Sequence, residues 1–213
     1  MKNIFCIVPR GSGESVSAAA AAAGSRGGTI LPARGTAENG LLQLLGLGDT
    51  AKDIVFTIVD DDLAAPVSTA IRGYAATQKP HFGVLFTVDV PSFTKSGDAR
   101  PTPSGEAPMQ SETNYRMINV IVNKGYADDA MAAARKAGAT GGTVLGARGT
   151  AKEDDAKFFG VPLVPEKEQL VVLVPADKAS AVFDAIRALP CFAEKGSGIA
   201  FTIPVSDFAL LGK

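Results

Sequence analysis

One segment occurs twice in the chain, and this repeat constrains the fold more than any other feature. Residues 27–37 read GGTILPARGTA and residues 141–151 read GGTVLGARGTA, so 9 of the 11 paired residues are identical at a shift of 114. Farther along, residues 70–72 (AIR) recur as residues 185–187 at a shift of 115. An internal repeat is decisive for architecture. We therefore expect the 213 residues to form two related domains of roughly 90 to 100 residues, each large enough to bury a core.

The composition is that of an ordinary globular protein, with 46% hydrophobic and 20% charged residues. No apolar run approaches the length of a membrane span, and the stretch at residues 4–8 is too brief for a signal-peptide core. We expect a soluble, cytoplasmic protein without direct membrane insertion. The net charge of −1 provides no basic field for nucleic acid. The two cysteines, Cys6 and Cys191, are not equivalent in the repeat, which favours reduced thiols over a disulfide.

The order of apolar segments in each copy predicts the pattern βαββαβ. A helix is expected after the first strand and another, with apolar residues at helical spacing, before the last. Such an order predicts an α+β fold of two tandem ferredoxin-like domains, each with an antiparallel four-stranded sheet. The expected strands are residues 3–8, 27–33, 54–59 and 84–90 in the first copy, and residues 117–122, 141–147, 169–174 and 199–205 in the second.

The boundaries of the copies follow from the repeat and from a change of composition between them. We predict a first domain at residues 1–93, a linker at residues 94–114 and a second domain at residues 115–213. The linker region is rich in Pro, Ser, Thr, Gly and Glu, which cannot build a core. Several strands are apolar on both faces, which predicts that the open face of each sheet is buried in a homo-oligomer.

A long loop separates the second and third strands of each copy, and a lysine stands at the start of each third strand, Lys52 and Lys167. Residues 195–201 read KGSGIAF. Together with the βαββαβ order, these features resemble the nitrogen-regulatory P-II signalling family, and more closely its divergent P-II-like members. The resemblance implies a trimer with nucleotide clefts between neighbouring subunits. It also implies that the long loop, called the T-loop, regulates a target protein such as a transporter or an enzyme.

The resemblance implies a ligand site for a small anion, most plausibly an adenine nucleotide. Glycines in a turn let backbone N–H groups approach an anion, and Arg148 with Lys167 could supply charge to phosphate oxygens. In the family, basic residues directly after the last strand hold the triphosphate, and residues 204–207 (PVSD) supply none here. ATP, ADP or AMP is therefore expected to bind only weakly, and no tightly bound cofactor is predicted. The candidate binding residues are Arg148, Gly149, Lys167, Gly196, Ser197 and Gly198 in the second copy, and Arg34, Gly35 and Lys52 in the first.

The chain is poorly equipped for catalysis. His81 is its only histidine, and no nucleophile-elbow or P-loop pattern occurs. We therefore predict no enzyme activity, no catalytic residue and no metal site, and we interpret His81 as a loop residue. Residues 60–62 (DDD) are explained by an acidic start to a helix. Two alternatives stay open: a structural or scaffold oligomer, and a small-molecule or metal-tolerance binding protein of the same fold.

Overall fold

The chain divides into two compact units whose membership does not follow the repeat. Unit 1 comprises Met1–Pro32, Ala51–Asn114 and Pro204–Lys213, and unit 2 comprises Ala33–Thr50 and Tyr115–Ile203. A piece of the first copy therefore belongs to unit 2, and the end of the second copy belongs to unit 1. The structure is a computed structural model, and it describes residues 1–36, 50–93, 102–103, 114–148, 157–158, 161–162, 166–193 and 197–212.

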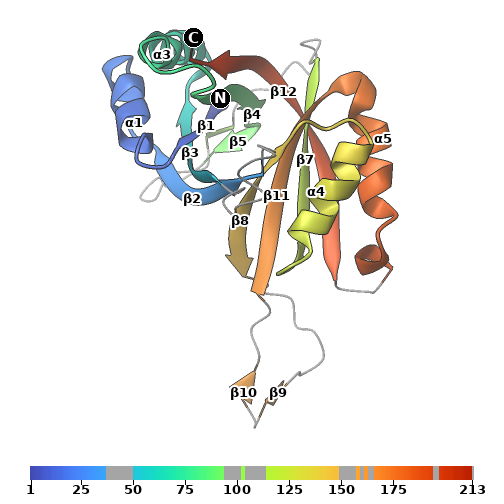
Figure 1. Cartoon of the computed structure of the whole chain (residues 1–213). Coiled ribbons are helices and arrows are strands. Elements are labelled where there is room, and N and C mark those ends of the chain that lie inside the picture. The colour runs from blue at the N-terminus through green and yellow to red at the C-terminus, as the bar shows by residue number, and fades with distance from the viewer. Residues whose placement is uncertain are drawn as a thin grey trace. The chain divides into compact units, whose positions relative to one another are not determined.

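Unit 1 is a sheet with two helices on one face (Figure 1). Its central strand β1 pairs antiparallel with β3 on one side and β4 on the other. Apolar residues that alternate along these strands meet the buried faces of the helices, where Val16 and Ile71 are fully covered. The bounds are β1 Lys2–Pro9, α1 Gly13–Ala22, β2 Thr29–Gly35, β3 Thr50–Val59, α3 Asp61–Ala75 and β4 Gly83–Asp89.

Unit 2 repeats this plan with the second copy. Strand β11 pairs antiparallel with β7 and β8, and the helices α4 and α5 cover one face over a core that includes Ile118, Met131 and Leu170. The alternation of apolar residues again places one side of each strand in this core. The bounds are β7 Tyr115–Asn123, α4 Ala127–Lys136, β8 Gly142–Arg148, β11 Glu166–Pro175, α5 Ala176–Arg187, the 3-10 helix Pro190–Phe192 and β12 Gly198–Leu211.

Two strands continue past the unit in which they begin. Strand β2 ends with Arg34 and Gly35 paired with Val144 and Thr143 of β8. Strand β12 has 14 residues, and from Ser206 onward it pairs with β4. The edges of β8 and β4, which would each have ended a four-stranded sheet, are thereby covered.

The predicted fold class is therefore wrong. The eight long strands form one closed antiparallel barrel in the order β1-β3-β2-β8-β11-β7-β12-β4, and not two tandem ferredoxin-like domains with separate four-stranded sheets. The physical reason is the length of β2 and β12. Our prediction ended the last strand at residue 205, whereas the chain stays extended to Leu211 and uses its backbone groups to pair with β4.

Two short antiparallel pairs lie in the segments between the long strands. Strands β5 (Ser92–Phe93) and β6 (Thr102–Pro103) pair with each other near the predicted linker. Strands β9 (Lys157–Phe158) and β10 (Val161–Pro162) pair within the second long loop. The rest of that loop, most of the first long loop and most of the predicted linker lie outside the described residues.

Candidate functional site

A carboxylate at the start of the third strand of each copy binds the first helix of its unit. Asp53 Oδ2 accepts hydrogen bonds from the backbone N–H groups of Gly11 at 2.8 Å and Gly13 at 3.3 Å. The equivalent Glu168 Oε2 accepts from Gly125 at 3.0 Å and Ala127 at 3.4 Å. Gly13 and Ala127 are the first residues of α1 and α4, and Gly11 and Gly125 lie two residues before them. N–H groups at a helix start have no acceptor in the helix, and a negative charge there is favourable. In both units the helix N-terminus is thus occupied by the protein itself.

The cations around these carboxylates differ between the units. In unit 1, Arg10 Nε lies 2.9 Å from Asp53 Oδ1 and donates a hydrogen bond to the Lys52 carbonyl oxygen at 3.1 Å. Lys52 is half-buried, and this burial lowers the pKa of its ammonium group below the ordinary value. Its side chain is therefore less strongly biased toward the charged form than an exposed lysine.

In unit 2, the residue equivalent to Arg10 is Lys124, and it pairs with a different carboxylate. Lys124 Nζ lies 2.6 Å from Glu166 Oε2, and this hydrogen bond, with the charge of Glu166, raises the pKa of Lys124. Glu168 is faced instead by Arg34, whose Nη2 lies 3.7 Å from Glu168 Oε1. Arg34 Nη1 also donates to Asp128 Oδ1 at 3.0 Å.

The described candidates of the second copy lie together at one end of the unit 2 sheet. Arg148 ends β8 opposite Glu166, the first residue of β11, and Lys167 follows as the next residue. The Lys167 ammonium group donates a hydrogen bond to Asn123 Oδ1 at the end of β7. Gly149 and Gly196 lie outside the described residues.

Ser197 and Gly198 stand at the start of β12, on the other side of β7. A Cβ atom at Gly198 would lie 3.1 Å from the Ile121 carbonyl oxygen and 3.2 Å from the ring of Phe192, so the backbone there is packed closely against its neighbours. The strand order β8-β11-β7-β12 therefore gathers Arg148, Lys167 and Gly198 along one row of strand ends.

The first-copy candidates are not gathered in this way. Arg34 and Gly35 pair with β8 and belong to unit 2, whereas Lys52 belongs to unit 1. Arg34 is already engaged by two carboxylates. His81, with φ of 58°, lies in the loop before β4, as predicted for a loop residue.

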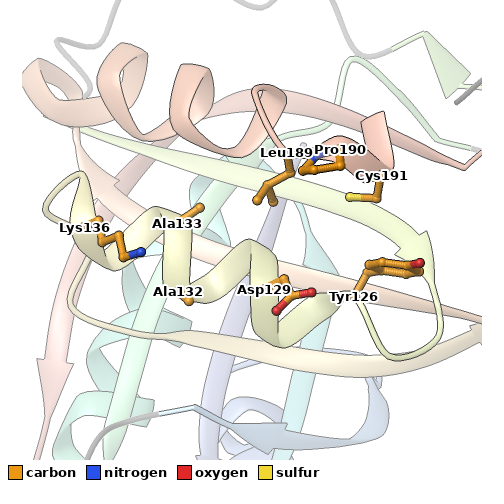
Figure 2. Close-up of a pocket in the computed structure, with 8 residues that line it drawn as sticks. All are labelled: Tyr126, Asp129, Ala132, Ala133, Lys136, Leu189, Pro190 and Cys191. Atoms are coloured by element: carbon orange, nitrogen blue, oxygen red, sulfur yellow. The ribbon is translucent and has the colours of Figure 1, made fainter. Parts of the chain in front are cut away.

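A pocket of about 400 Å³ lies in unit 2 between α4 and the segment that follows α5 (Figure 2). Its wall is mostly apolar, with the ammonium group of Lys136 at one end and the ring of Tyr126 at the other. The sequence analysis did not predict this pocket, because small residues on a helix do not reveal a cavity. The lining residues are Tyr126, Asp129, Ala132, Ala133, Lys136, Leu189, Pro190 and Cys191.

The cysteines and the acidic residues offer little further chemistry. Cys6 is buried, which raises the pKa of its thiol to about 12, and neither cysteine is in a disulfide. Among the described residues, His, Cys, Asp and Glu do not form a group of three or more that could hold a metal ion. Asp60 precedes α3, and Asp61 and Asp62 lie in its first turn, as expected for an acidic helix start.

Comparison with known protein families gives a match in the second copy. The model of the family described as nitrogen regulatory protein P-II matches residues 115–211. The second half of the chain is similar to this family. The resemblance stated from the sequence is thereby confirmed, and the matched residues include Arg148, Lys167 and Gly198.

Among solved structures, Arabidopsis thaliana PII bound to citrate is similar to part of the chain. The two are 24% identical, and the similarity covers 45% of this chain and 78% of that one with a TM-score of 0.36. No curated protein matches the chain. In the part of the chain that the structure describes, none of the helices is long and apolar enough to cross a membrane.

Proposed function

We propose that this protein is a non-enzymatic, P-II-like signalling protein that binds a small anionic metabolite, an adenine nucleotide, at the strand ends of unit 2. One observation carries the proposal. Arg148, Lys167 and the Ser197–Gly198 backbone, which are far apart in the sequence, share one end of a sheet in the half that matches the P-II family. Gly149 and Gly196 flank these residues in the sequence and complete the proposed site.

The chemistry of this row suits a phosphate group. Arg148 is exposed and offers the planar guanidinium that binds phosphate oxygens in pairs. Lys167 is half-buried, and its bond to Asn123 restricts the ammonium group to the sheet edge. Gly198 packs closely against Ile121 and Phe192, which requires a residue without a side chain there. The proposal assigns the backbone N–H groups of the turn at residues 196–198 to the anion, as in other glycine-rich anion sites.

The same surroundings predict modest affinity. Glu166 and Glu168 stand on either side of Lys167 and oppose an incoming anion. Residues 204–207 (PVSD) carry no basic side chain, and they belong to unit 1, where Asp207 is bonded to Arg72. We expect a Kd in the micromolar range or weaker, corresponding to a binding free energy of about −8 kcal/mol or less favourable.

The output of this signal is assigned to the long loops, residues 36–52 and 150–167. In our proposal the parts of these loops between Thr36 and β3 and between β8 and β11 order when ligand or partner binds, and they regulate a transporter or an enzyme in the cytoplasm. The trimer of chains implied by the family stays a prediction, and light scattering of the purified protein tests it.

Titration calorimetry with ATP at low ionic strength tests the site. We expect Lys167→Ala and Arg148→Ala each to weaken ATP binding about tenfold, because each removes a charge-assisted hydrogen bond worth about 1.5 kcal/mol. The matched control is Lys178→Ala, an exposed lysine of the same unit in the first turn of α5, at the far end of β11. Unchanged affinity in both site variants would contradict the proposal.

A second candidate function is favoured by the pocket beside α4. A volume of about 400 Å³ is within the range of small-molecule sites, which supports binding of a small molecule there. The variant Ala133→Trp, which fills this pocket, separates the two sites in the same titration. Loss of ATP binding in Ala133→Trp, with binding retained in Lys167→Ala, would show that ATP binds in the pocket and not at the strand ends.

A further inference from the structure

The two units balance the charge of their helix-capping carboxylate in different ways. In unit 1, Asp53 is paired by Arg10, which lies in the turn between β1 and α1 of the same copy. In unit 2, the equivalent turn residue Lys124 pairs with Glu166, and Glu168 receives its cation from Arg34. Arg34 belongs to the first copy of the repeat but to unit 2 of the fold. The second copy therefore receives the ion-pair partner of Glu168 from the first copy, and Lys124 adds a weaker charge interaction with Glu168.

The segment that carries Arg34 is fixed firmly in unit 2. Thr36 is only 6% exposed, and its hydroxyl and backbone N–H both bond the Gly142 carbonyl oxygen, at 3.0 and 2.9 Å. The Gly142 N–H donates back to Thr36 Oγ1 at 2.9 Å, and the Arg135 guanidinium donates to the Thr36 carbonyl oxygen. Such a network restricts the backbone on both sides of Gly35. Arg34 is thus held in place by its backbone as well as by its ion pairs.

Glu168 connects this cation to the proposed ligand site. The Glu168 side chain is 15% exposed and holds the N–H groups of Gly125 and Ala127. It lies two residues after Glu166, so it faces the same side of β11 as Glu166 and the strand partner of Glu166, Arg148. Without Arg34, its negative charge would be less compensated next to a site for an anion. We propose that Arg34 is a positioning residue for the second copy's anion site, acting through Glu168. This inference rests on the proposed function.

ATP titration of the full chain tests the inference, with Arg34→Gln as the main variant because glutamine keeps hydrogen-bonding capacity and loses the charge. We expect Arg34→Gln to weaken ATP binding about three- to fivefold, the size expected for one uncompensated charge at a partly solvated site. Arg34→Lys should keep most of the affinity. The control Arg187→Ala removes another arginine of unit 2, paired with Asp184 on α5 at 3.0 Å, and should leave the affinity unchanged.

A double variant shows whether the effect passes through Glu168. In a Glu168→Gln background, the carboxylate charge is absent, and adding Arg34→Gln should no longer weaken ATP binding. Hydrogen exchange of the Gly125 and Ala127 amides provides a ligand-independent reading, and it should accelerate in Arg34→Gln but not in Arg187→Ala.

The outcomes separate the inference from the proposed function. No ATP binding by the wild type would refute the anion site itself, and the role of Arg34 in it. Wild-type binding with equal affinity in Arg34→Gln would overturn the inference alone. Arg34→Gln could also weaken ATP binding equally with and without Glu168→Gln. Such a result would show that Arg34 acts through the structure of its segment, and it would overturn the proposed action through Glu168.

Discussion

Leu211 provides the most direct test of the exchange of strands between the units. It lies in the second copy of the repeat, yet it is 2% exposed in the core of unit 1, paired with Gly83 of β4. Leu211→Ala removes about three buried carbon groups, worth roughly 0.8 kcal/mol each, and leaves a cavity, so we expect a loss of about 3 kcal/mol in unfolding free energy. Its neighbour Leu210 is 72% exposed, and Leu210→Ala should cost less than about 0.5 kcal/mol.

Urea unfolding combined with amide hydrogen exchange measures both the size and the place of this effect. Exchange of the core amides of β1 and β4, such as Ile4 and Leu85, should accelerate in Leu211→Ala. Amides of the unit 2 core, such as Ile118, should change less. Two results would refute the pairing of β12 with β4. One is a Leu211→Ala protein as stable as Leu210→Ala, and the other is accelerated hydrogen exchange in Leu211→Ala at amides of unit 2 alone.

Two further predictions concern unit 1. Gly83→Ala should lower the unfolding free energy, measured by thermal unfolding, by at least about 3 kcal/mol, because a Cβ atom there would lie 2.2 Å from the Ile7 carbonyl oxygen. The control Gly73→Ala in α3 has open space around the new Cβ atom and should be neutral or stabilising. Cys6 keeps its proton when folded until about pH 12 but loses it near pH 9 when unfolded, so this group's stabilisation is lost as the pH rises between these values. The unfolding free energy of the wild type should fall there by up to about 1.4 kcal/mol per pH unit more steeply than that of Cys6→Val, and parallel curves for the two proteins would contradict the assignment.

Much of the candidate site could be predicted from the sequence because the repeat marks equivalent positions. Arg148 was singled out from the repeated segment and Lys167 from the resemblance to the P-II family, and the strand register brings both to one end of a sheet. The contacts of Arg34 could not be predicted in this way. The repeat makes it the counterpart of Arg148, but its guanidinium is engaged with Asp128 and Glu168, because the segment that carries it pairs with β8. The pocket beside α4 also required the tertiary structure.

The sequence by itself determined where the helices and long strands lie, because apolar spacing and backbone propensity act over a few residues. It also showed that one plan is used twice. Only the tertiary structure decided that β2 reaches β8 and that β12 reaches β4. Strand pairing at an edge is made by backbone N–H and C=O groups, which every residue except proline carries alike. The side chains of residues 33–36 and 204–211 therefore indicate an extended segment but do not determine which strand it pairs with. The pairing depends on how the whole chain packs.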